Sequence, residues 1–113
     1  MEQVLNRLKI AAGALMLVAS ATAYASAASK LVQRLEAYKG RPAADVFDKV
    51  GYPDRKETFG DDTVYYWGTD QVDGPSCTYN IAVGPDGLIK KASSYGNDWG
   101  CGPIAKRLKS PAS

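Results

Sequence analysis

Apolar positions change their spacing along the chain, and each spacing predicts a different kind of element. They run almost unbroken from Ile10 to Ala19, then recur every three or four residues, and from Arg55 onward alternate with polar positions. An unbroken run is typical of a leader or membrane segment, helical spacing of an amphipathic helix, and alternation of a half-buried strand. The pattern therefore predicts an apolar leader, a short helical region and a sheet.

Two short helices are predicted after the leader, Ser29–Lys39 and Pro42–Val50. Ser29 can cap the first helix, and Gly40 and Gly51 stand just past the two ends. Apolar residues fall on one face of each helix: Leu31, Leu35 and Tyr38 in the first, Val46, Phe47 and Val50 in the second. Because so few residues join the two helices, they must pack as a corner or a hairpin.

Strands are predicted in the rest of the chain: Arg55–Phe59, Thr63–Gly68, Cys77–Val83 and Leu88–Tyr95. The sequences Gly60-Asp61-Asp62 and Gly84-Pro85-Asp86-Gly87 are typical of tight turns, so neighbouring strands should pair antiparallel. Three further segments are predicted as two polar loops and a short terminal helix: Thr69–Ser76, Gly96–Gly102 and Pro103–Lys109.

This order predicts an α+β fold in which two short N-terminal helices pack on one face of a three- to four-stranded antiparallel sheet. One point stays open, because both faces of Thr63–Gly68 are apolar: either Val64 and Tyr66 or Tyr65 and Trp67 face the helices. We place the first pair in the core, which is then Leu31, Leu35, Val46, Phe47, Val50, Val64, Tyr66, Ile81, Val83 and Ile89.

The apolar start of the chain has the layout of a secretory signal peptide. Arg7 and Lys9 precede the apolar run, and Ala23-Tyr24-Ala25 fits the small-x-small cleavage pattern. The run is shorter than the roughly 20 residues of a transmembrane helix. We expect a signal peptide over 1–25 cleaved near Ala25, a single domain over 26–113 with a frayed tail at 110–113, and a periplasmic or secreted protein. A retained N-terminal anchor is the alternative.

Cysteine usage agrees with export. Cys77 and Cys101 are the two cysteines of the chain, and an even pair in a small exported domain predicts a disulfide. Closing this loop should stabilise the fold by about 3 kcal/mol through the entropy of the unfolded chain. A metal-binding or reactive thiol pair is the rival interpretation, but the chain has no histidine and no C-x-x-C motif.

Charge and composition exclude several functions. The 14 Lys and Arg residues nearly balance the 12 Asp and Glu residues, which leaves no basic footprint for nucleic acid. The absence of histidine removes the commonest general base. Asp61-Asp62 is typical of a turn, and the segment with Asp70 and Asp73 lacks the ligand density of a calcium site. We expect a protein that is not an enzyme and needs no cofactor or metal.

Aromatic residues are the candidates for binding. A sheet covered by helices on one face leaves the other open, and exposed Tyr and Trp are favoured contact residues. The candidate surface is Tyr65, Trp67, Tyr95 and Trp99, with Tyr66 and Tyr79 assigned to the core. For Trp99, packing against the disulfide is the competing expectation.

Between residues 29 and 95 the order of motifs resembles a known group. A helix is followed by Gly40-Arg41-Pro42-Ala43-Ala44-Asp45-Val46, Val50-Gly51-Tyr52-Pro53-Asp54, the strand Val64-Tyr65-Tyr66-Trp67 and a Gly-Pro-Asp-Gly turn. This resembles the small outer-membrane-assembly lipoproteins (SmpA/OmlA, also called BamE) and the related domain repeated in secreted β-lactamase inhibitor proteins. Those lipoproteins carry a lipidated cysteine after the signal, and this chain has none there. The resemblance therefore implies the fold and a protein-binding use rather than outer-membrane assembly.

Together these observations predict an exported, non-enzymatic protein-binding module of the cell envelope that uses the open sheet face. Its partner would be an envelope protein or an exported enzyme. One alternative is an inhibitor of a secreted or periplasmic hydrolase, in which Gly60–Asp62 or Gly96–Gly102 should protrude. Another is a binder of cell-wall glycan or a small ligand, with Trp67 and Trp99 as stacking platforms.

Overall fold

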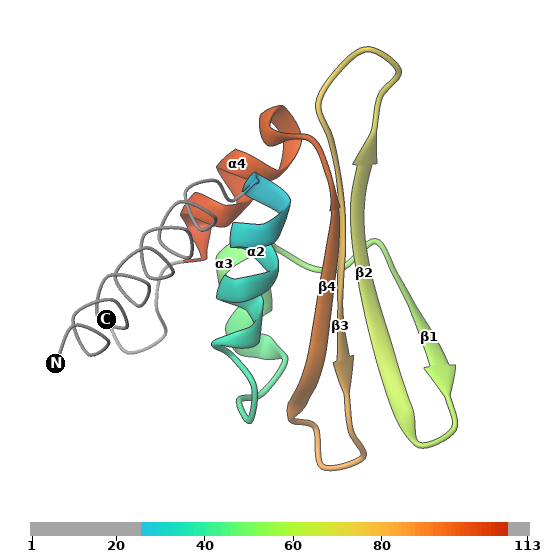
Figure 1. Cartoon of the computed structure of the whole chain (residues 1–113). Helices are drawn as coiled ribbons and strands as arrows, with labels where there is room; N and C mark the ends of the chain where they lie inside the picture. Colours follow the sequence, from blue (N-terminus) through green and yellow to red (C-terminus); the bar gives the residue numbers. More distant parts are fainter. Residues whose placement is uncertain (1–25, 109–113) are drawn as a thin grey trace, which may run out of the picture.

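The computed structural model describes residues 26–108, so the expected signal peptide and frayed tail lie outside the described residues (Figure 1). The described part has an α+β fold with a four-stranded antiparallel sheet and one disulfide, which confirms the predicted class. Its elements are α2 Ala27–Glu36, α3 Ala44–Val50, β1 Arg55–Phe59, β2 Asp62–Asp70, β3 Ser76–Val83, β4 Ile89–Gly96 and α4 Asp98–Arg107.

The strands follow one another in the sheet in chain order, β1-β2-β3-β4, and every neighbouring pair is antiparallel. Short turns cause this order: Gly60 and Asp61 alone join the paired residues Phe59 and Asp62. Gly60 has a φ of +62°, which suits the first central position of a type II′ hairpin turn. The pairs Tyr65↔Ile81 and Trp67↔Tyr79 put these four side chains on one face of the sheet.

The helix predicted at Ser29 begins earlier, at Ala27. Ser26 caps it, because its Oγ accepts a hydrogen bond from the Ser29 N–H at 3.1 Å. A second contact at this end comes from the Asp98 carboxylate, which accepts a hydrogen bond from the Ala27 N–H at 2.9 Å. The start of α2 is therefore tied to the first turn of α4.

The expectation of a loop at Gly96–Gly102 is wrong, because α4 already begins at Asp98. Asn97 provides the cap, and its Oδ1 accepts a hydrogen bond from the Gly100 N–H at 2.8 Å. Several glycines and Pro103 predicted a loop here, but the cap and the disulfide at Cys101 hold the segment in a helix. The covering layer is consequently not made by two N-terminal helices alone, since α2 packs against both α4 and β4.

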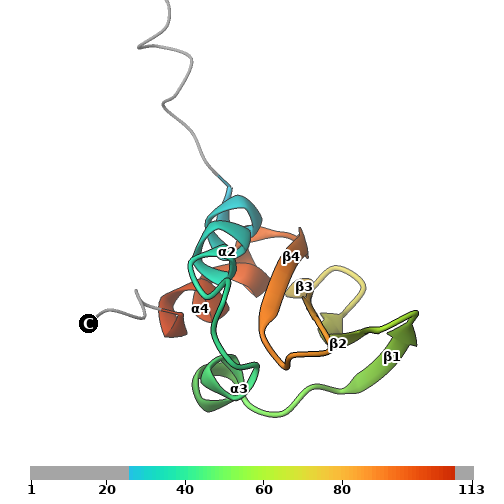
Figure 2. The same cartoon turned by 90° about the horizontal axis from the view of Figure 1, so that it is seen from below.

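The core lies between the helices and one face of the sheet, and Figure 2 shows the helices gathered on that side. Its buried apolar residues are Leu31, Leu35, Tyr38, Val46, Trp67, Cys77, Tyr79, Ile81, Val83, Ile89, Ala92, Cys101, Ala105 and Leu108. Phe47 and Val50 pack against this cluster while partly exposed. The assignment of Val64 and Tyr66 to the core is wrong: both are only half-buried, and Trp67 takes their place.

Candidate functional site

Tyr65 and Trp67, two of the predicted contact residues, face the helices. Trp67 is 6% exposed and stacks on Tyr79 with ring centroids 5.1 Å apart. Its Nε1–H donates to the Gly51 carbonyl oxygen at 3.0 Å, so the indole is satisfied without water. Tyr65 meets the edge of the Phe47 ring, with centroids 5.2 Å apart. The expectation that this pair lies on the open face is therefore wrong.

Tyr79 is the most perturbed titratable group of the covered face. Burial raises the pKa of Tyr79 to about 12, while Arg107 lowers it and Asp54 raises it more weakly. Burial also raises the pKa of Tyr38 above its ordinary value. Both shifts follow from the cost of placing a phenolate in an apolar core, so they indicate packing rather than chemistry.

The open face carries the other side chains of the strands. Since Tyr66 pairs with Asn80 and Gly68 with Thr78, these four lie on the side opposite the helices. Tyr95 pairs with Thr78 across β3 and β4 and is 80% exposed. Other members of this face are Arg55, Glu57, Phe59, Asp62, Val64, Ala82, Lys91 and Ser93. Of the predicted contact residues, Tyr95 alone lies here.

Charged groups surround the tyrosine and valine at the centre of this face. The Arg55 guanidinium lies 4.0 Å from the centre of the Tyr66 ring, a cation–π geometry, and it also pairs with Glu57. At the far end, Lys90 Nζ lies 3.1 Å from Asp62 Oδ2. The open face therefore has a small aromatic and aliphatic centre with ion pairs beside it.

A hollow of about 310 Å³ opens beside Tyr66, lined by Asp54, Arg55, Trp67, Gly68 and Thr78. Gly68, near the end of β2, lines this hollow without a side chain. A Cβ at this position would come within 2.9 Å of Thr78 Cγ2. Neither the open-face position of Tyr66 nor this hollow was predicted from the sequence. The signal that could have found them is the clean alternation of β3, whose polar Asn80 lies opposite Tyr66.

Trp99, the remaining predicted contact residue, is 65% exposed in the first turn of α4. Most of its indole is in solvent, so the expectation that it packs against the disulfide is wrong. Tyr95 and Trp99 thus stand on either side of the junction between β4 and α4. Tyr95 belongs to the open face, and Trp99 to a helix on the covered side.

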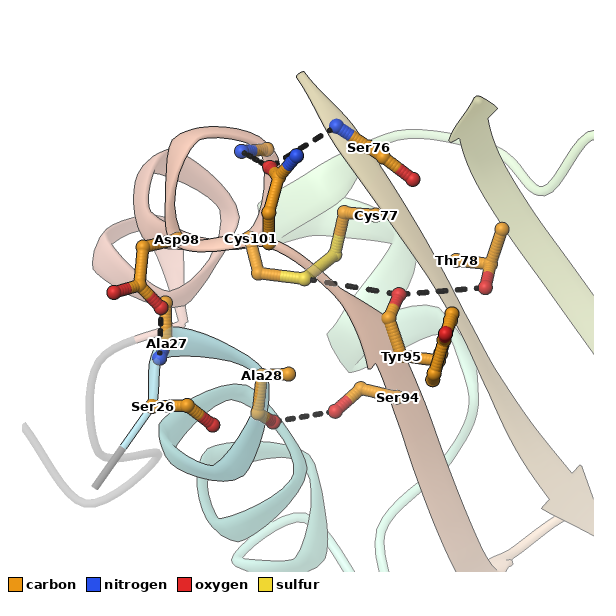
Figure 3. The surroundings of a disulfide bond; sticks show 12 residues. Ser26, Ala27, Ala28, Ser76, Cys77, Thr78, Ser94, Tyr95, Asp98 and Cys101 are labelled. Atoms are coloured by element: carbon orange, nitrogen blue, oxygen red, sulfur yellow. Dashed lines mark hydrogen bonds between the residues drawn. A yellow bond between two sulfur atoms is a disulfide. The ribbon is translucent and has the colours of Figure 1, made fainter. Parts of the chain in front are cut away.

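This junction is held tightly, as Figure 3 shows around the Cys77–Cys101 disulfide. The backbone of Ser76 lies so close that a Cβ at Gly96 or Gly100 would come within 2.2 or 2.4 Å of the Ser76 carbonyl oxygen. Only glycine permits that approach. Tyr95 is consequently presented from a rigid strand end, which lowers the entropic cost of any contact it makes.

Asn97 ties the β2–β3 loop to the same junction. Its Oδ1 accepts hydrogen bonds from the Gly100 N–H at 2.8 Å and the Ser76 N–H at 3.2 Å. Its Nδ2 donates to the Gly74 carbonyl oxygen at 3.0 Å. Asn97 was not predicted from the sequence, although Asn is favoured at a helix N-cap and an acidic residue, Asp98, follows it in the first turn.

Within residues 26–108 the His, Cys, Asp and Glu side chains form no group of three or more that could hold a metal ion. Asp61 is exposed in the β1–β2 turn, and its neighbour Asp62 is paired with Lys90. No helix of this described range is long and apolar enough to cross a membrane.

Comparisons with known protein families, curated proteins and solved structures found no match to the chain. The relation to the small assembly lipoproteins remains a resemblance of motifs.

Proposed function

We propose that the chain is an exported, non-enzymatic module of the cell envelope that binds a partner protein through the open sheet face. The observation that carries this proposal is the exposure of Tyr95, 80% on a face that no helix of the described chain covers. Tyrosine supplies a large, stiff contact area and a hydroxyl, and is enriched among residues that dominate binding energy.

The composition of the face supports a protein partner. Val64, Tyr66 and Ala82 form a half-buried centre, and the ion pairs Arg55–Glu57 and Lys90–Asp62 lie beside it. An apolar centre with a polar rim is the usual anatomy of a protein–protein interface. Tyr66 and Tyr95 thus replace Tyr65 and Trp67 as the proposed contact residues.

Inhibition of a hydrolase is the second candidate, and one observation favours it. Val72 is 93% exposed in the β2–β3 loop, and that loop is held by the bond between Asn97 and the Gly74 carbonyl oxygen. A fixed loop with an exposed apolar residue can enter a cleft. The glycan-binding alternative loses one of its two stacking platforms, because Trp67 is buried under Tyr79.

Export is tested by the N-terminus of the protein isolated from the producing cells. We expect the first residue to be Ser26, found by N-terminal sequencing of protein from the envelope or medium. A protein that begins at Met1 and sediments with membranes would instead support the retained anchor.

Binding is tested by a photo-crosslinking amino acid placed at position 95 in the producing cells, with position 52 as the matched control. Tyr52 is equally exposed, at 86%, but its ring lies 5.9 Å from Phe47, on the side of the helices. We expect position 95 to capture one protein that position 52 does not. Capture that Tyr66→Ser leaves intact, or glycan alone at position 95, would contradict the proposal.

A further inference from the structure

The second strand is longer than the first, which leaves part of its edge unpaired. β1 reaches only as far as Tyr66, opposite Arg55, whereas β2 continues to Asp70 and pairs there with β3 alone. Figure 1 shows β2 rising past the start of β1 toward the β2–β3 loop. Gly68 and Thr69 are exposed. The sheet therefore has an open edge between Gly68 and Asp70.

Main-chain groups of this segment point outward from the sheet. The Gly68 N–H donates to Asp54 Oδ2 at 2.9 Å, and the Tyr66 carbonyl oxygen accepts from the Asp54 N–H at 2.8 Å. Because backbone direction alternates along a strand, the Gly68 C=O and the Asp70 N–H point to this same side. One residue of an added parallel strand would bridge them, its N–H donating to Gly68 and its C=O accepting from Asp70.

A hollow lies on each side of the open edge. The hollow of about 310 Å³ beside Tyr66 is on the open face. A second hollow of about 230 Å³ is on the helix face, where Val50, Trp67, Tyr79 and Ile104 line it. Successive side chains of a strand point to opposite faces. Neighbouring residues of an added strand would therefore meet one hollow each, the mode in which pockets give specificity to strand addition.

The charge around the edge selects the occupant. Between residues 57 and 89 the chain has no Lys or Arg, and Asp73 lies in the β2–β3 loop next to the open edge. Asp54 adds a carboxylate at the edge itself, and the neighbouring Arg55 is engaged with Tyr66 and Glu57. An acidic surface attracts cations and repels a second acidic edge. A second copy of this chain is therefore disfavoured here, and a basic segment is favoured.

We propose that the edge of β2 from Gly68 to Asp70 binds an extended, basic peptide segment of a partner protein as an added strand, with an apolar side chain in the helix-face hollow. This contact is separate from the open-face binding at Tyr95. It requires no change of fold, because the edge and both hollows are already present.

The test uses the isotopically labelled, disulfide-bonded protein and the peptide acetyl-Arg-Lys-Val-Thr-Arg-amide as probe, whose central Val lies opposite Thr69 and so faces the helix-face hollow. We expect NMR shift changes at the amides of Gly68, Thr69 and Asp70, and slower hydrogen exchange of the Asp70 amide, with little change at Tyr95. N-methylation of the central peptide residue removes the donor to Gly68 and should abolish these changes. The same peptide with Glu at its three basic positions should bind at least tenfold more weakly.

Asp54→Asn is the matched protein variant, because its side-chain oxygen can still accept the Gly68 N–H while the charge is lost. We expect at least a threefold weaker affinity for the basic peptide, and Asp73→Asn serves the same purpose should Asp54→Asn alter the fold. Tyr95→Ser should leave peptide binding unchanged, which separates this edge from the proposed open-face function. Equal binding of the N-methylated peptide, or shifts centred on Tyr95, would overturn the proposal.

Discussion

The two faces of the sheet contain aromatic residues from the same strand, yet these residues serve opposite purposes. Trp67 lies on the covered face, stacked on Tyr79 and hydrogen bonded to Gly51. Tyr66, the preceding residue, lies on the open face, with the Arg55 guanidinium over its ring. Hydrophobicity alone does not separate the two. The neighbours across the strands do, since Tyr79 lies opposite Trp67 and Asn80 opposite Tyr66.

The same contrast extends to what each face contributes to stability. The covered face holds the disulfide and the buried apolar cluster. It therefore contributes to the free energy of unfolding through burial of apolar surface and through the restriction that the disulfide places on the unfolded chain. The open face is held by exposed ion pairs, which are worth little in water. Substitutions on the two faces should therefore differ strongly in their effect on stability, and the order of these effects tests the comparison.

The largest difference is expected between Trp67→Ala and Tyr66→Ala. Removing the buried indole leaves a cavity and an unpaired Gly51 carbonyl, and should lower the free energy of unfolding by about 3–5 kcal/mol. Tyr66→Ala, on the half-exposed side of the same strand, should cost under about 1.5 kcal/mol. Urea unfolding followed by circular dichroism measures both. Equal losses would mean that the open face is also part of the core.

The disulfide comes next. Replacing Cys77 and Cys101 by serine should lower the free energy of unfolding by about 3 kcal/mol, because the unfolded chain gains the freedom of the closed loop. Asn97 and the close approach of Gly100 to Ser76 still hold α4 in place, so the native circular dichroism spectrum should survive. A midpoint of urea unfolding that does not change would show that the junction needs no covalent tie.

The pH dependence of stability offers a third test of the covered face. Burial raises the pKa of Tyr79 to about 12, against an ordinary value of 10.0 in the unfolded chain. Between these values the unfolded state loses the phenolic proton and the folded state keeps it, so stability should fall as pH rises from 10.0 to about 12.

Tyr79→Phe is the control for this titration. The substitution should remove part of the loss of stability above pH 10.0. The remaining loss should follow the titration of Tyr38, because burial also raises the pKa of Tyr38 above its ordinary value. Urea unfolding at stepped pH, together with absorbance of the phenolate, measures both effects. A stability profile of Tyr79→Phe that matches that of the unsubstituted protein would place the titration elsewhere.

The comparison of faces also shows what the sequence could predict. Strand existence and order followed from alternation and turn residues: β1 was predicted at its observed bounds, Arg55–Phe59. The sequence of β2 alone could not predict which of its side chains point to the helices, because both of its faces are apolar. It depends on register, which the short turn at Gly60 and pairing with β3 set together. For this reason Tyr65 and Trp67 were assigned to the wrong side.

The start of α4 was missed for a different physical reason. Glycine and proline at positions 96, 100, 102 and 103 predict a loop by their local preferences. Here Gly96 and Gly100 are needed because the Ser76 backbone passes too close for any side chain. Packing against the Ser76 backbone thus requires glycine at two positions where glycine locally disfavours a helix. Tyr95 lies next to the end of β4 on the open face, whereas the exposure of Trp99 depends on a helix that local preference does not predict.

The smallest effect should come from the ion pair of the open face. Lys90→Ala removes the pair with Asp62, and both side chains are substantially exposed. The free energy of unfolding should change by less than about 1 kcal/mol, and the change should shrink further as salt is raised, because screening already weakens the pair in the unsubstituted protein. Urea unfolding at low and high salt gives both values, and Lys91→Ala, which also replaces a lysine exposed on β4, is the matched control.

A loss well above 1 kcal/mol that high salt does not diminish would mean that Lys90 stabilises the fold by packing along the sheet. The open face would then contribute to the core as the covered face does, and it could not be regarded as a surface free to bind a partner.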